Sequence, residues 1–439
     1  MLEILADRTY RHLFTAQVTA LIGTGLATIA LGLLAYDIAG GEAAMVLGTV
    51  FTIKMVAYIS VAPIASAVAH RIPRRALLVA LDIVRAGIAL TLPFVTEVWQ
   101  LYVLIFLLQS ASAAFTPTFQ AAIPDVLPEE SRYTRALSLS RLAYDLENIV
   151  SPTLAALLLA VMSYDALFLG TMAGFLASAA LVISVLLPSP AVSVPRNIRD
   201  RTTRGIRIYL ATPRLRGLLA LNVTAAAIGA MVLVNTVVLV RGELGLGENA
   251  VAWTMCGFGA GSMLAAVALP RLLEHVPERL AMLAGAALTI AGLSFLAVVV
   301  PTVGLSWMLL LGAWFAAGIG YSFTLTPSGR LLRRSSHPED RPALFAAQFT
   351  LSHACWLATY PLSGWLMTAF GPAAAFAGLS AVAVCGAVLA LRLWPAADPV
   401  AVLHRHDDLP PDHPHLRGSG AHAHPYVIDD LHRRWPPAS

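Results

Sequence analysis

Seven ionisable side chains interrupt stretches of this chain that are otherwise apolar: Lys54, Asp82, Arg85, Arg141, Asp145, Glu147 and His353. Charged groups in such surroundings are costly, so they are usually paired or functional. An imidazole and a carboxylate together can bind a divalent cation such as Ni²⁺, Co²⁺ or Zn²⁺. Both groups also titrate near neutral pH when buried. The residue types therefore predict a cation site, a proton carrier, or both.

Three of these residues share one expected depth. Lys54, Glu147 and His353 each lie about 11 residues from an end of their apolar stretch, or about 16 Å along a helix. That depth is near the middle of a hydrocarbon core about 30 Å thick. We expect Glu147 and His353 to be functional, with Lys54 as the counter-charge of Glu147 when the site is empty.

The stretch around Glu147 predicts a polar helix face about 160° wide. One stripe holds Arg141, Asp145, Asn148 and Pro152, and the adjoining stripe holds Tyr144, Glu147 and Ser151. Arg141 and Asp145 are four residues apart, so a simple ion pair explains them as well as a binding role does. For Asp82 and Arg85 we favour structural pairing. Gln348 accompanies His353 and is a further candidate for the substrate or proton site.

The amino-acid composition indicates the class of protein to which these residues belong. The chain has 439 residues, of which 58% are hydrophobic and 12% charged. About 25% charge is usual in soluble proteins, so a soluble enzyme, a nucleic-acid binder and a disordered protein are excluded. We predict an all-α polytopic membrane protein without a cleaved signal peptide, a disulfide framework or a resident cofactor. Its twelve apolar spans are 12–36, 43–68, 74–95, 98–118, 136–162, 166–187, 216–240, 250–271, 279–300, 303–327, 342–369 and 372–394.

Basic residues predict the orientation. If the N-terminus is cytoplasmic, 25 of the 29 basic residues fall in cytoplasmic segments, as the positive-inside rule requires. Both termini are then expected inside. The basic segment between the sixth and seventh spans predicts four parts: a six-helix half at 1–187, a linker at 188–215 that lies against lipid headgroups, a second six-helix half at 216–394, and a tail at 395–439. The halves repeat weakly, as in transporters with a central site between two repeats.

The tail is rich in histidine and proline and is expected to be disordered. Three His-x-His pairs recur at a spacing of nine residues: His404 with His406, His413 with His415, and His422 with His424. Histidine with nearby aspartate and no thiol favours Ni²⁺, Co²⁺, Zn²⁺ or Cu²⁺. We predict metal binding by the tail, and a chance compositional bias is the alternative.

A family resemblance follows from the segment between the second and third spans. Ser66-Ala-Val-Ala-His70-Arg71-Ile-Pro73-Arg74-Arg75 resembles the Gly-x-x-x-Asp-Arg-x-Gly-Arg-Arg motif of the major facilitator superfamily. Arg71, Arg74 and Arg75 match, whereas His70 replaces the aspartate. The resemblance implies the two-half transporter fold and a cytoplasmic latch formed by these arginines with Asp82 and Arg85. The Asp82-x-x-Arg85 pattern is similar to that of drug and siderophore exporters.

A narrower resemblance comes from three segments. The tail from His404, the stretch from Ser140 to Asn148 and the stretch from Gln348 to Trp356 look like those of bacterial nickel-resistance permeases of this superfamily. This implies export of Ni²⁺, or of Co²⁺ or Fe²⁺, by proton antiport across the bacterial inner membrane.

Two other functions stay open. One is a proton-coupled drug or siderophore exporter with an incidental tail, and the other is a metal sensor that retains the fold. An enzyme is not expected, since GxSxG, Walker and HExxH motifs are lacking. The expected partners are the lipid bilayer, divalent cations and protons, with no nucleic acid and no obligate protein.

Overall fold

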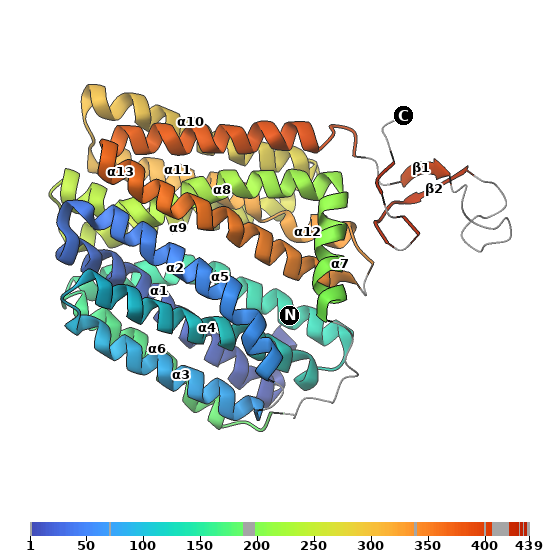
Figure 1. Ribbon diagram of the computed structural model, residues 1–439, viewed down its shortest axis with the longest axis horizontal. Coiled ribbons are helices and arrows are strands. Elements are labelled where there is room, and N and C mark those ends of the chain that lie inside the picture. Colours follow the sequence, from blue (N-terminus) through green and yellow to red (C-terminus); the bar gives the residue numbers. More distant parts are fainter. Residues whose placement is uncertain are drawn as a thin grey trace.

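The computed structural model describes residues 2–69, 72–187, 198–337, 340–398, 401–405, 421–429, 431–432 and 434–436. Long helices dominate and lie roughly along one direction (Figure 1). The N-terminal bundle consists of α1 (Arg8–Ala39), α2 (Ala43–Ala69), α3 (Arg74–Thr91), α4 (Val98–Val126), α5 (Glu130–Leu159) and α6 (Asp165–Ile183). The C-terminal bundle consists of α8 (Pro213–Val237), α9 (Glu248–Leu272), α10 (Glu278–Val303), α11 (Trp307–Leu325), α12 (Ser328–Arg334) and α13 (Arg341–Leu393).

Local sequence explains where these helices begin and end. Asp7 caps α1 by accepting a hydrogen bond from the backbone N–H of Tyr10 at 2.9 Å. Gly40 ends the same helix with a φ of 52°, which favours glycine. Short helical turns extend several elements: the 3₁₀ helices Leu2–Ala6, Gly40–Glu42 and Leu92–Phe94, and a π-helical turn at Val238–Glu243 after α8.

The apolar helices confirm the polytopic membrane architecture. Nine apolar stretches of the described residues are long enough to cross a membrane. Two of them are about twice the usual length: Arg8–Val61 spans α1 and α2, and Ala343–Leu393 contains a break at Gly371, where φ is 80°. Helix α5 is not among the nine, and among the described residues its apolar part is Val150–Leu159. Counting the two long stretches as pairs and adding α5 gives the twelve spans that the sequence predicts.

Between the bundles runs α7 (Ile198–Ala211), inside the segment predicted to be a headgroup-facing linker. Its apolar side packs on the C-terminal bundle, since Ile208 and Tyr209 are fully buried in a cluster with Leu215 and Leu344. Arg204 forms an ion pair of 2.6 Å with Asp340 at the start of α13. The helix is thus attached to the C-terminal bundle on one side.

The tail contains the β-structure of the described residues. Strands β1 (Ala401–Arg405) and β2 (Ala421–Pro425) pair antiparallel, with His404 opposite His422 and Val402 opposite His424. The sequence predicts disorder for the whole tail, whereas this part has a defined register. Residues 406–420, which include His406, His413 and His415, lie outside the described residues.

Candidate transport site

The two bundles meet closely at one end of the molecule, which we call the glycine-packed end. A Cβ on Gly364 of α13 would lie 2.3 Å from the carbonyl oxygen of Ala44 on α2. A Cβ on Gly48 of α2 would lie 2.7 Å from the carbonyl oxygen of Tyr360 on α13. Only glycine permits this approach, so the backbones of α2 and α13 touch directly.

Further contacts between the bundles lie at the same end. Thr153 of α5 and Cys256 of α9 hydrogen-bond at 3.2 Å. Arg241, beyond α8, forms an ion pair of 2.6 Å with Asp37 near the end of α1. The opposite end holds the start of α1, the start of α3, and helices α7 and α12, and we call it the arginine-rich end.

An aromatic row runs along the face of α13 that approaches α2. It consists of Phe349, His353, Trp356 and Tyr360, which share one helix face by their spacing. From α2, the ring of Tyr58 stacks on His353 with centroids 6.0 Å apart, and Phe51 stacks on Tyr360 at 4.9 Å. Phe349 is 45% exposed, whereas Tyr360 is 5% exposed. The row therefore opens from the glycine-packed end toward the arginine-rich end.

His353 occupies the centre of this row, as its expected depth implies. Its Nδ1 lies 2.7 Å from the backbone carbonyl oxygen of Phe349. A carbonyl can only accept, so Nδ1 carries the hydrogen and donates it. The other ring nitrogen, Nε2, is then the one with a lone pair while the ring is neutral. His353 can thus take up a proton or bind one ligand through Nε2.

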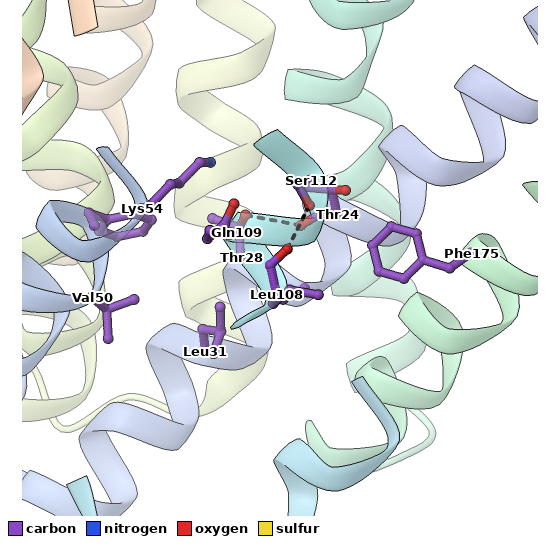
Figure 2. Close-up of a pocket in the computed structure, with 11 residues that line it drawn as sticks. Thr24, Thr28, Leu31, Val50, Lys54, Leu108, Gln109, Ser112 and Phe175 are labelled. Atoms are coloured by element: carbon purple, nitrogen blue, oxygen red, sulfur yellow. Dashed lines mark hydrogen bonds between the residues drawn. The ribbon is translucent and has the colours of Figure 1, made fainter. Parts of the chain in front are cut away.

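Lys54 of α2 lies on the other side of this interface. It lines a small cavity inside the N-terminal bundle, together with residues of α1, α4 and α6 (Figure 2). Tyr58, one helical turn after Lys54 on the same face of α2, stacks on His353, so Lys54 and His353 lie on facing helices about one turn apart. The joint role of these two residues at one transport site stays a prediction.

Five candidate residues lie on α5: Arg141, Tyr144, Asp145, Glu147 and Asn148. The structure describes their backbone as helical, and their side chains lie outside the described residues. Helix α5 packs against α1 and against α9, so it borders both bundles. Their predicted roles at the site stay predictions.

The residues of the expected latch have described contacts within the N-terminal bundle. Asp82 is fully buried on α3, where it pairs with Arg85 and accepts a hydrogen bond of 2.8 Å from Ser178 on α6. The Arg85 guanidinium lies 4.0 Å from the ring centre of Phe115 and 4.4 Å from that of Phe175. This arrangement ties α3, α4 and α6 together, in agreement with the favoured structural pairing.

The arginines of the motif are less completely described. Arg75 donates a hydrogen bond to the backbone carbonyl of Ile183 at the end of α6. Arg74 begins α3, and Arg71 lies outside the described residues. Their predicted latch role stays a prediction.

Gln348 lies away from His353. Tyr209 of α7 donates its hydroxyl hydrogen to the Gln348 side-chain oxygen. Burial raises the pKa of the Tyr209 hydroxyl far above its usual value, so this group stays a donor. Five residues separate Gln348 from His353, which turns the two side chains about 140° apart on a helix. Gln348 therefore joins α7 to α13.

The end of the tail packs on the arginine-rich end of the C-terminal bundle. Tyr426 and Ile428 are buried with Leu215 and Leu331 in one apolar cluster. Asp398 forms ion pairs with Arg214 at 3.6 Å and with Arg334 at 3.2 Å.

Asp429 adds polar contacts to this packing. It lies 3.0 Å from Nδ1 of His432 and 3.3 Å from Nε2 of His337 in the segment before α13. Among the residues that the structure describes, no group of three His, Cys, Asp or Glu side chains is placed to hold a metal ion. The side chains of His404 and His422 lie outside the described residues.

Comparison with known proteins identifies the fold family. The sequence pattern of the Major Facilitator Superfamily matches residues 13–239 and again 218–419. The chain belongs to this superfamily. It is therefore a multi-pass membrane transporter and not an enzyme, as the sequence predicts.

A relative in Bacillus subtilis (strain 168), the uncharacterised MFS-type transporter YfiS, is 27% identical over 211 residues. The match covers 46% of this chain and 50% of YfiS, so the chain spans about half the length of that relative.

Solved structures support the same fold. A POT family transporter in complex with a thioalcohol-conjugated peptide has a TM-score of 0.68 at 12% identity, and the match covers 88% of this chain and 95% of that one. A bacterial homologue of the human lysosomal transporter Spinster, inward-facing and occupied, has a TM-score of 0.66 at 13% identity over 88% and 98%. The nucleoside transporter NupG has a TM-score of 0.63 at 12% identity over 88% and 98%.

The aromatic row is the feature that the sequence interpretation misses. Hydropathy counts aromatic residues as ordinary apolar ones, so the row does not stand out within its span. The signal that could have found it is the spacing of 349, 353, 356 and 360, which repeats every three or four residues.

Proposed function

We propose that this transporter is a secondary-active exporter of amphipathic organic solutes, which bind between the bundles against the aromatic row. The observation that carries the proposal is the row itself, in which Phe349 is exposed and His353 and Trp356 are only partly buried where α13 faces α2. Flat aromatic side chains offer large apolar contact area to a ring-containing solute. For a free metal ion the row offers a single imidazole nitrogen, that of His353, and its remaining rings are no metal ligands.

The proposed transport cycle uses the two ends of the molecule. We place the arginine-rich end in the cytoplasm of a bacterial plasma membrane, by the excess of basic residues there. The glycine-packed end is then closed toward the outside, which suits a state that receives solute from the cytoplasm. Protons entering from outside drive the exchange, with His353 and the α5 carboxylates as the candidate carriers.

Dye accumulation in cells tests this function. Cells expressing the protein are loaded with rhodamine 6G, and the retained fluorescence is followed with time. We expect wild type to lower retention, Trp356→Ala to lose most of that effect, and Trp365→Ala to keep it. Trp365 is a matched control, because it lies on the same helix outside the row and is 46% exposed. Equal behaviour of the two variants would contradict the proposed site.

Export of divalent metal cations is the second candidate. The observation in its favour is the pairing of His404 opposite His422, since directly opposed residues place their Cβ atoms about 5 Å apart on one face. Two imidazoles at that spacing are suited to Ni²⁺, Co²⁺ or Zn²⁺.

Radioactive nickel retention in a metal-sensitive host separates the candidates. Four chains are compared: the full chain, a chain ending at Pro395, Glu147→Gln with His353→Ala, and Trp356→Ala. Loss of nickel export in the double variant, with a smaller effect of truncation, would favour the metal function. Unchanged nickel content with all four chains would remove it.

A further inference from the structure

We propose that Lys54 holds the acidic group of the transported solute, so that the natural substrate class is an organic anion with a flat apolar portion. This inference rests on the proposed function, because the apolar portion is the part that the aromatic row would bind. It is carried by a cavity beside Lys54 that stabilises its positive charge, and by the position of that charge next to the row.

The cavity has a volume of about 20 Å³ and lies within the N-terminal bundle. This is enough room for one water molecule, which needs about 10–15 Å³. The polar lining comes from three helices, with Lys54 on α2 and with Thr24, Thr28, Gln109 and Ser112 on α1 and α4 (Figure 2). Phe175 of α6 borders the same space.

The hydroxyl groups of this cavity have already used their hydrogens. Thr24 donates to the carbonyl of Ala20 at 2.9 Å, and Thr28 donates to the carbonyl of Thr24 at 3.0 Å. Ser112 likewise donates to the carbonyl of Leu108 at 3.0 Å. What the three oxygens can still offer is lone pairs. These three acceptor oxygens suit an ammonium group or a water that hydrates it, and the Gln109 amide in the same lining adds an acceptor oxygen and N–H donors.

This lining explains how an intramembrane lysine keeps its charge. An ammonium has three hydrogens to donate and pays a large penalty if it loses its hydration within the membrane. The oxygens of Thr24, Thr28 and Ser112, directly or through one water, replace part of that hydration. Lys54 is therefore a lasting positive charge, and a cavity of about 20 Å³ has no room for an organic acid, so an anion must approach Lys54 from outside it.

The aromatic row lies on that other side. Tyr58 follows Lys54 by one helical turn on the same face of α2, and its ring stacks on His353 of α13. An acidic group between α2 and α13 would thus meet a cation while its attached ring meets the row.

Glu147 provides the alternative for Lys54. If the carboxylate of Glu147 is its lasting partner, the ion pair is structural, and both Lys54→Gln and Lys54→Arg would impair the protein whatever the solute. If a solute anion takes that place during transport, removal of the Lys54 charge acts on anions selectively. The two interpretations therefore differ in charge selectivity.

The test uses two dyes that share a xanthene ring system, anionic fluorescein and cationic rhodamine 6G. Binding to the purified full-length protein and uptake into inside-out membrane vesicles are measured at one salt concentration. We expect Lys54→Gln to weaken fluorescein binding and uptake about tenfold, the factor that about 1.4 kcal/mol carries. Lys54→Arg should retain fluorescein, and neither variant should lower rhodamine 6G. Arg392→Gln, which removes an exposed charge at the end of α13, is the matched control.

Each outcome separates this inference from the proposed function. If Trp356→Ala weakens both dyes but Lys54→Gln affects them equally, the aromatic site stands and the anion proposal is overturned. If Trp356→Ala affects neither dye, the proposed function itself fails. Wild type that neither binds nor transports fluorescein also overturns the inference. Thermal unfolding of each purified variant shows whether a loss reflects misfolding.

Discussion

The two ends of the molecule are held together by different means. At the glycine-packed end, the bundles touch through the backbones of α2 and α13 at Gly48 and Gly364. At the arginine-rich end, the described ion pairs and apolar contacts join helices within one bundle, or join the tail and α7 to the C-terminal bundle. Backbone contact requires a close fit over a short range, whereas long charged side chains tolerate changes in distance. The glycine-packed end is thus suited to close tightly between the two bundles. The arginine-rich end is suited to let the bundles separate and come together again.

The largest effect is expected from breaking the pairing inside the N-terminal bundle. Asp82→Asn leaves the buried Arg85 guanidinium without its counter-charge, which costs about 3–5 kcal/mol. Thermal unfolding in detergent should show a much lower midpoint. Asp37→Asn, at the more exposed pair with Arg241, is the control. Similar midpoints for the two variants would show that burial does not decide the strength of these pairs.

A smaller effect is expected from one methyl group at the glycine-packed end. In Gly364→Ala the new Cβ would lie 2.3 Å from a backbone oxygen, so the bundles must separate, at a cost of about 1–3 kcal/mol. We expect export to fall about tenfold or more. Gly312→Ala on α11 is the control, because no atom lies within 4 Å of its added Cβ. Export that tolerates both substitutions would disprove close backbone packing as the seal.

At the arginine-rich end, Asp429→Asn should loosen the tail. The carboxylate accepts hydrogen bonds from the backbone N–H groups of Leu431 and His432, at 2.8 and 2.7 Å. Such bonds to a charged group are worth about 1.5–3 kcal/mol. Hydrogen exchange of these two amides, followed by mass spectrometry, should speed up about tenfold or more, with amides of α10 as the reference.

The same attachment has a defined pH dependence. Burial alone would raise the pKa of Asp429, but the hydrogen bonds from His432 and Leu431 and the charge of His432 hold it below its ordinary value. A lowered pKa stabilises the attachment above the ordinary aspartate value, and this stabilisation is lost as the pH falls through the lowered pKa. Exchange at 431–432 should stay slow, relative to α10, down to that ordinary value. Loosening near pH 6 would show that the histidines control the attachment.

The smallest effect is expected at the pair of Arg241 with Asp37. These side chains are 23% and 36% exposed, so their ion pair is worth about 0–1 kcal/mol. Arg241→Gln should leave the unfolding midpoint nearly unchanged and should alter export less than Gly364→Ala does. A loss of export as large as that of Gly364→Ala would make charge, instead of backbone fit, the seal of this end.

The sequence predicts the helices well because hydropathy reports burial in lipid. The expected span 98–118 becomes α4, and the actual helix continues to Val126. The expected span 136–162 becomes α5, which begins earlier, at Glu130, with several polar residues. The helices extend beyond the predicted apolar spans, and composition alone does not predict the residue at which a helix begins or ends.

Side-chain direction is harder to predict than depth. Lys54 and His353 lie on facing helices, since Tyr58, one turn after Lys54, stacks on His353. Gln348 has a suitable depth as well, but the rotation of α13 turns it toward Tyr209 of α7. That contact depends on where the linker helix packs, which no periodicity within α13 reveals.

The N-terminal segment packs on the N-terminal bundle, and the end of the tail packs on the C-terminal bundle. The distance between these two segments therefore reports the relative position of the bundles during transport. Ile4 is buried with Leu127 and Ala136 in the N-terminal bundle, and Ile428 is buried with Leu215 and Leu331 in the C-terminal one. If the bundles rock as rigid bodies, fluorophores placed near the two termini would change their energy transfer with every opening and closing. The protein thus carries natural attachment points for watching single turnovers without a label inside the membrane.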